Sequence, residues 1–132
     1  KDLVPTEIEL VAVPVYDFPA KRPRHGKHDP IVETIQTENK GDITKYGIVI
    51  RGEKLEPDFR DGDIVIASKI PRIADGDAAV VHLNSGEIVV ARVYRQNKNI
   101  VCVYGNTSFP PRVILDGDVD EMHRVVERIT RY

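Results

Sequence analysis

The stretch from Arg51 to Ser68, RGEKLEPDFRDGDIVIAS, decides the fold of this 132-residue chain. Gly52 follows a β-branched run, where a sharp turn favours a residue without a Cβ atom. Pro57 fixes the backbone on the far side of the turn. Gly62 then leads into the apolar run DIVIA, which is typical of a buried strand. We therefore predict two rigid strands joined by a loop with Lys54 at its exposed tip, and loops on such scaffolds commonly carry function.

Short β-branched runs recur along the chain, separated by turn sequences such as ADGD, NSGE and QNKN. Many short strands with regular turn signals are typical of a mostly antiparallel β sandwich or barrel. We therefore expect a mostly β fold with little helix. The predicted strands are Ile8–Val15, Tyr46–Arg51, Asp63–Ala67, Ala78–Leu83, Ile88–Arg95, Asn99–Tyr104, Val113–Leu115 and Met122–Ile129.

One short helix is predicted at Pro30–Thr37, because Asp29 can cap it and proline suits the first helical position. The preceding run, DFPAKRPRHGKHD, is predicted to be a loop, with the cations of Lys21–Lys27 unbalanced by acids within the run. Its charge and reach suit contact with DNA phosphates, but we favour the interpretation of a solvated, mobile connection. His25 and His28 lie in the same loop without a partner cysteine, so we predict no metal site.

The composition suits one domain with its own apolar core. Hydrophobic residues make up 41% of the chain, and no apolar run is long enough to cross a bilayer, so no membrane contact is expected. The single cysteine, Cys102, lies in an apolar run, which predicts a buried thiol in a reducing, cytoplasmic setting. The net charge of −2 argues against a domain that grips DNA with its own surface. His82 and His123 stand alone in strand-like runs, and we expect surface or hydrogen-bonded histidines rather than catalytic bases.

The opening stretch resembles the signature G-D-S-M-x-P-x-x-x-x-G-D-x-V of LexA, phage CI repressors and UmuD, the self-cleaving serine peptidases of the LexA-like fold. Gly52, Pro57, Gly62 and Val65 stand at matching positions. The run VAVPVYDF is similar to the strand before that family's cleavage site, and IADGDAAVVHLNSGEIVVARVYRQNKNIVCVYGN is similar to its central segment. The similarity covers nearly the whole chain and is weakest from Pro19 to Lys45. It implies a LexA/signal-peptidase-like β fold of short antiparallel strands.

In that family a serine at the loop tip attacks an Ala-Gly bond of the same chain, and a buried lysine takes the serine proton. The resemblance places Lys54 at the serine position and Ala91 at the lysine position. Alanine has no titratable group, and the neighbouring Arg92 is a poor base that points to the opposite face of a strand. The chain also contains no Ala-Gly pair. We therefore predict that it is not an enzyme and that it uses no cofactor or metal.

Three serines remain as alternative nucleophiles: Ser68, Ser85 and Ser108. None has a lysine or histidine at a recognisable spacing. An active or atypical self-cleaving S24 peptidase nevertheless stays open as an alternative. A dyad can also be removed by engineering, but serine to lysine is not a natural choice for that, so we favour a naturally inactive domain. A UmuD-like accessory subunit is the other alternative.

The resemblance implies the regulatory and oligomerisation domain of a phage-type transcriptional repressor, spanning residues 11–132, with residues 1–10 as the end of a linker and the first strand. Operator DNA would then be contacted only through a helix-turn-helix domain located before Lys1. The expected partners are further copies of the chain, as a homodimer or higher homo-oligomer, and an antirepressor protein that replaces self-cleavage as the release signal.

The closing portion, FPPRVIL and MHRVVERITRY, holds more apolar side chains than one short edge needs. Because dimer interfaces have an apolar centre with a polar rim, we predict the oligomer interface there. The alternative is that these residues only fill the core and a sheet edge. The predicted interface residues are Phe109, Val113, Leu115, Val125 and Ile129.

Overall fold

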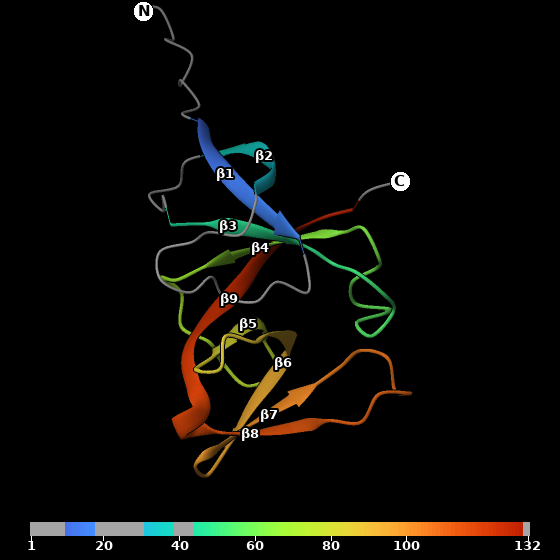
Figure 1. The fold of residues 1–132 in the computed structure, drawn as a ribbon, viewed down its shortest axis with the longest axis vertical. Coiled ribbons are helices and arrows are strands. Elements are labelled where there is room, and N and C mark those ends of the chain that lie inside the picture. Colours follow the sequence, from blue (N-terminus) through green and yellow to red (C-terminus); the bar gives the residue numbers. More distant parts are fainter. Residues whose placement is uncertain (1–9, 18–30, 39–43, 131–132) are drawn as a thin grey trace, which may run out of the picture.

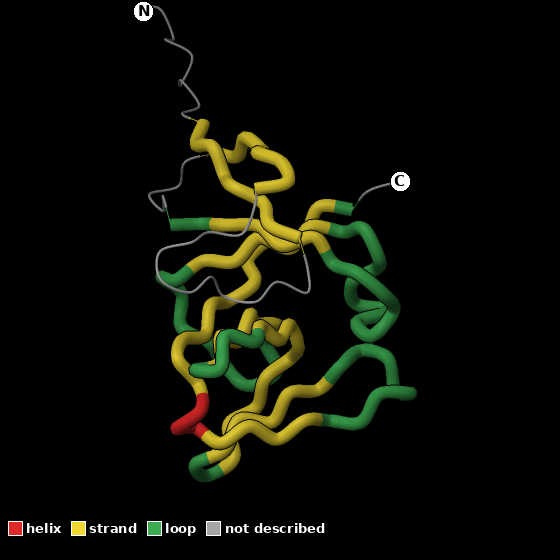
Figure 2. The backbone as a smooth tube through the Cα atoms, in the orientation of Figure 1, coloured by secondary structure: helices red, strands yellow, loops and turns green. Residues whose placement is uncertain are grey.

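The computed structural model describes residues 10–17, 31–38 and 44–130. Within these ranges lie nine strands and one 3-10 turn, shown as a ribbon in Figure 1 and by type of structure in Figure 2. The prediction of a mostly β fold with little helix is therefore confirmed. The elements are β1 (Leu10–Asp17), β2 (Ile31–Glu38), β3 (Tyr46–Val49), β4 (Ile64–Ser68), β5 (Ala78–Leu83), β6 (Ile88–Gln96), β7 (Asn99–Val103), β8 (Arg112–Leu115), η1 (Asp116–Asp118) and β9 (Val119–Ile129).

The strands form one continuous sheet in the order β2-β1-β3-β4-β9-β5-β6-β7-β8, rather than the two faces of a sandwich. All neighbouring strands run antiparallel except β1 and β3, which are parallel. The last strand, β9, lies between β4 and β5 and pairs with both. In Figure 1 it runs from the β1–β4 part of the sheet to the β5–β8 part. The C-terminal strand therefore holds the two halves of the sheet together.

The helix predicted at Pro30–Thr37 is wrong, because this segment is strand β2, which pairs antiparallel with β1. Its sequence IVETIQTE is rich in β-branched residues, which pack well on a pleated surface. Ile35 lies opposite the buried Val13 of β1. Strand pairing therefore outweighed the local helix propensity of this segment. The proposed cap, Asp29, lies outside the described residues.

The eight predicted strands are all present where the structure describes them, with ends shifted by a few residues. Ala78–Leu83 has the predicted bounds, and β9 begins at Val119, three positions before the predicted start. Ile8 and Glu9, the predicted start of the first strand, lie outside the described residues.

The core consists of two clusters of buried side chains. The larger cluster packs among β3–β8, and the smaller one lies between β1, β3 and β4. Strands β3 and β4 alternate between them, since Val65 belongs to the larger cluster and Ile64 and Ile66 to the smaller one. Burial on both faces explains why DIVIA is a continuous apolar run rather than an alternating one. Cys102 is fully buried in the larger cluster, as predicted, and burial raises the pKa of its thiol.

Candidate functional site: the Lys54 loop

The loop between β3 and β4 is closed at its base by two backbone hydrogen bonds. The N–H of Ile50 donates to the carbonyl of Asp63, and the N–H of Gly62 donates to the carbonyl of Ile50, both at 2.7 Å. Gly52 and Gly62 have φ values of +85° and +90°, which other residues rarely adopt. The N–H of Gly52 donates to Asp61 Oδ1 at 2.7 Å. The two glycines thus set the sharp entry and exit that the sequence predicted.

The middle of the loop is a compact turn fixed by one buried side chain. Leu55 is 5% exposed and belongs to the larger core cluster. Its carbonyl accepts the N–H of Phe59 at 2.9 Å, and the N–H of Glu56 donates to the carbonyl of Glu53 at 3.1 Å. The Glu56–Pro57 peptide bond is cis. The loop is therefore an integral part of the core and not a loose surface excursion.

Lys54 lies at the exposed tip, as predicted, and its ammonium group contacts two aromatic rings. Its Nζ atom lies 4.4 Å from the ring centroid of Tyr104 and 5.6 Å from that of Phe109. At such distances the face of an aromatic ring attracts a cation. The backbone N–H of Asn106 donates to the carbonyl of Lys54 at 3.1 Å. The tip is thus docked on the connection between β7 and β8.

Gly105 permits this docking. A Cβ atom built on Gly105 would lie 2.7 Å from the carbonyl oxygen of Leu55 and 2.8 Å from that of Glu56. Both atoms belong to the backbone, so neither can rotate away. The side chain of Asn106 adds a hydrogen bond from Nδ2 to the carbonyl of Glu53 at 3.2 Å. The segment after β7 therefore needs glycine at this point to approach the loop.

Ala91 lies on β6 opposite Ala79 of β5, and it is 1% exposed in the same core cluster as Leu55. Arg92 is exposed, in agreement with its predicted place on the opposite face. Its Nε atom donates to Asp58 Oδ2 at 3.0 Å, and its Nη1 atom donates to the carbonyl of Gly76 at 2.8 Å. The hydrogen bond to Asp58 raises the pKa of Arg92, so this group stays charged and serves as a tether for the loop.

A family model described as Peptidase S24-like matches residues 24–127. The chain belongs to this family. It is also similar to the LexA repressor of Koribacter versatilis (strain Ellin345), with 24% identity over 106 residues. That match covers 76% of this chain and 50% of the repressor, so the chain spans about half the length of this relative. The S24-like membership confirms the resemblance inferred from the signature around Gly52.

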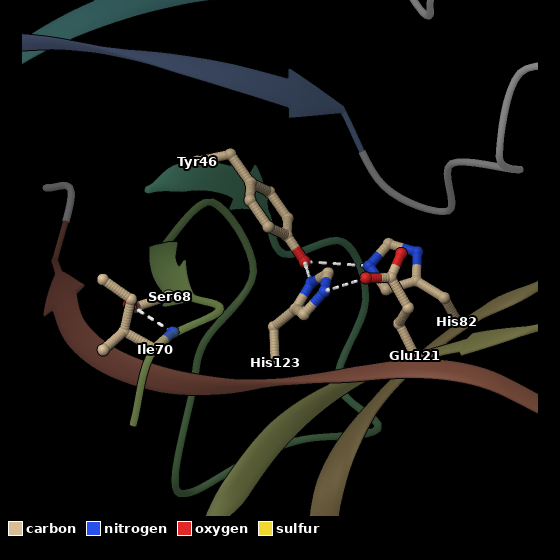
Figure 3. A network of polar contacts seen from close by, with 6 residues as sticks. All are labelled: Tyr46, Ser68, Ile70, His82, Glu121 and His123. Carbon is tan, nitrogen blue, oxygen red and sulfur yellow. Dashed lines mark hydrogen bonds and ion pairs between the residues drawn. The ribbon is translucent and has the colours of Figure 1, made fainter. Parts of the chain in front are cut away.

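The three serines of this S24-like chain have local structural contacts. Ser68 is 2% exposed, and its Oγ atom accepts the N–H of Ile70 at 3.3 Å (Figure 3). Ser85 Oγ accepts the N–H of Glu87 at 3.4 Å inside the turn between β5 and β6. The backbone N–H of Ser108 donates to Asn106 Oδ1 at 2.9 Å. Ser68 thus lies at the end of a strand, and Ser85 and Ser108 lie in turns.

The two histidines that stand alone in the sequence meet in the structure. Tyr46 of β3 places its hydroxyl oxygen 2.8 Å from Nε2 of His82 on β5 and 2.5 Å from Nδ1 of His123 on β9 (Figure 3). Both histidines are hydrogen-bonded, which is one of the two predicted alternatives, and both are buried rather than at the surface. Their meeting was missed, because Tyr46 is 36 residues from His82 and 77 from His123. The pairing of β9 with both β4 and β5, and of β4 with β3, brings these rings together.

The five predicted interface residues differ in how far they are exposed. Val113 and Leu115 on β8 are 60% and 61% exposed. Phe109 and Val125 are partly buried against the larger core cluster, and Ile129 packs against the smaller one.

The basic run Lys21–Lys27, with His25 and His28, lies outside the described residues. Within the described ranges, no helix has the length and apolar character to span a bilayer, and no group of three or more His, Cys, Asp and Glu side chains is arranged to hold a metal.

Proposed function

We propose that this chain is the non-cleaving regulatory and oligomerisation domain of a phage-type, LexA-like transcriptional repressor that acts in the cytoplasm. Membership of the S24-like family and the similarity to a LexA repressor support a repressor-type domain. The non-cleaving part is supported by two residues: the exposed Lys54 and the buried Ala91 stand where the resemblance would put the nucleophile and the base.

Neither residue suits peptide-bond cleavage. The ring of Tyr104 attracts the ammonium form of Lys54, which has no lone pair to attack a carbonyl. Ala91 offers no atom that could accept a proton, and it is enclosed by the larger core cluster. The nearest charged residue in the sequence, Arg92, is held on the other face by Asp58. On this proposal the loop carries the S24-like signature without a nucleophile and a general base.

The test uses the intact protein, including whatever precedes Lys1. It is incubated with activated RecA, and in parallel at alkaline pH, and then analysed by gel electrophoresis and intact mass. We expect one species of unchanged mass under both conditions. Two fragments would refute the non-cleaving assignment and support the self-cleaving peptidase. The LexA repressor of Koribacter versatilis, treated in the same way, is the comparison sample.

We also propose that further copies of the chain bind the exposed face of β6–β8. The strand register aligns Tyr94 with Val101 and Val101 with Val113, so three side chains form one row across the sheet. Tyr94 and Val113 are exposed, and Leu115 lies two positions further along β8. Among the described strands, β8 pairs only with β7 and forms one end of the sheet. An exposed apolar row beside an open edge is a surface that proteins commonly cover.

Light scattering coupled to size-exclusion chromatography tests this surface. Val113→Asp and Leu115→Asp place a charge at the centre of the proposed contact, and we expect both to shift the protein toward monomer. Gln36→Asp is the matched control, because Gln36 is exposed on β2, at the opposite end of the sheet order. An unchanged mass for both β8 variants would refute this surface. In the proposed repressor, the resulting oligomer would present its DNA-binding domains to the operator in pairs, and an antirepressor would act by disturbing that assembly.

A further inference from the structure

A buried group of polar rings joins the two halves of the sheet. Tyr46 of β3 contacts His82 of β5 and His123 of β9, and Glu121 lies next to His123 on the same strand (Figure 3). His82 is 9% exposed and His123 5%, and their ring centroids are 4.8 Å apart. The function proposed above makes no use of these residues. Tyr46 is the first residue of β3, and the Lys54 loop follows the other end of that strand.

The positions of the protons follow from the only member that cannot donate. The Glu121 carboxylate accepts, so the Nε2 atom of His123, at 3.5 Å from Glu121 Oε1, carries its hydrogen toward it. In a neutral ring, His123 Nδ1 then accepts the hydroxyl hydrogen of Tyr46 at 2.5 Å. The Tyr46 oxygen in turn accepts the Nε2–H of His82 at 2.8 Å. One directed chain results, from His82 through Tyr46 and His123 to Glu121, with both rings neutral.

We propose that this chain is a proton-sensitive clasp that holds β3 against β5 and β9 at neutral pH and releases it on acidification. A proton added to His123 Nδ1 meets the hydroxyl hydrogen of Tyr46, which must then turn away. A proton added to His82 as well places two cations in rings 4.8 Å apart. Like charges in a buried site repel strongly, because little water screens them.

Two ion pairs lie next to the clasp in the described residues. On β3, the neighbouring Lys45 lies 3.8 Å from Glu127 of β9. On β9, the neighbouring Arg124 lies 3.6 Å from Asp77. Strand β4 contributes Ser68, which is neutral, and β9 also carries Asp120 beside Glu121. The cations next to the clasp are therefore ion-paired, and Glu121 is the carboxylate that faces His123.

The sign of the pH dependence follows from proton counting. If the folded chain keeps at least one ring neutral where the unfolded chain protonates it, the unfolded chain binds more protons. Acidification then favours unfolding, and the effect begins near the ordinary histidine pKa of about 6.5. For each ring that stays neutral, the unfolding equilibrium constant rises about tenfold between pH 7.5 and pH 5.5.

The test compares equilibrium urea unfolding at pH 7.5 and pH 5.5 for three proteins. His82→Gln removes one ring of the clasp. On going from pH 7.5 to pH 5.5, the unfolding equilibrium constant of the wild type should rise by a factor at least about ten times larger than that of His82→Gln. The double variant His25→Gln/His28→Gln removes the other two histidines and should keep the wild-type response. Equal pH responses for wild type and His82→Gln would overturn the proposal, as would loss of the response in the double variant.

Nitrogen NMR of the wild type keeps the proposal testable even if His82→Gln does not fold. At pH 7.5, long-range proton–nitrogen correlations should show both buried rings as the Nε2–H form. On acidification, at least one of them should remain neutral below pH 6 while the two other histidines titrate. An Nδ1–H form of His123, or four rings titrating together, would refute the clasp.

Discussion

Replacing Gly105 by alanine should destabilise the fold by a calculable mechanism. The new methyl group would lie 2.7 Å from the carbonyl oxygen of Leu55 and 2.8 Å from that of Glu56. Because both atoms belong to the backbone, relief requires the loop and the β7–β8 connection to separate. Overpacking of this kind costs about 1–3 kcal/mol. The separation also weakens the hydrogen bonds from Asn106 to Lys54 and Glu53, each contributing about 1 kcal/mol.

We therefore expect Gly105→Ala to lower the free energy of unfolding by about 2–4 kcal/mol. Urea unfolding followed by circular dichroism measures this value. Gly117→Ala is the matched control: a Cβ atom there meets nothing within 4 Å, and the backbone needs no positive φ. Its effect should stay within about 0.5 kcal/mol. A cost below about 0.5 kcal/mol for Gly105→Ala would refute the tight docking of the Lys54 loop on this segment.

Two further predictions concern the core around the loop. Leu55→Ala should cost about 2–5 kcal/mol in urea unfolding, because Leu55 is 5% exposed in the larger cluster; a change under about 1 kcal/mol would mean that the loop does not share the core. Cys102 should resist a thiol-specific disulfide reagent in the native protein at pH 8 and react fully in urea. The side chain is 0% exposed, and burial raises the pKa of its thiol, so the thiol stays protonated. Fast reaction of the native protein would contradict that burial.

The sequence predicted well those features that depend on nearby residues. Runs of β-branched residues between turn signals located the strands, and Gly52 and Gly62 located the two ends of the loop. The segment at Pro30–Thr37 failed for the opposite reason. Its capping signal is local, whereas the strand is stabilised by pairing with β1, and Val13 opposite Ile35 is a contact that a one-dimensional pattern does not contain.

The clasp of Tyr46, His82 and His123 shows the same limit more sharply. Each residue lies in an ordinary strand, and nothing in its immediate sequence marks it as a member of a polar group. Their meeting depends on β9 pairing with both β4 and β5, which brings residues 77 positions apart within a hydrogen bond. The predicted interface residues differ in exposure for a related reason: Val125 and Ile129 pack against the core clusters from β9, whereas Val113 is exposed on β8.

The Lys54 loop shows why a family signature does not by itself establish the family's chemistry. Gly52 and Gly62 provide positive φ angles at the loop ends, which the turn needs whether or not the tip holds a serine. Leu55 fills the core, and Asp58 binds Arg92, so removing the loop would cost stability in a protein of any activity. The outline of the signature therefore serves folding whether or not the tip carries out chemistry. Lys54 and Ala91 stand where the resemblance would put the catalytic serine and lysine, so the non-cleaving proposal rests on these two positions.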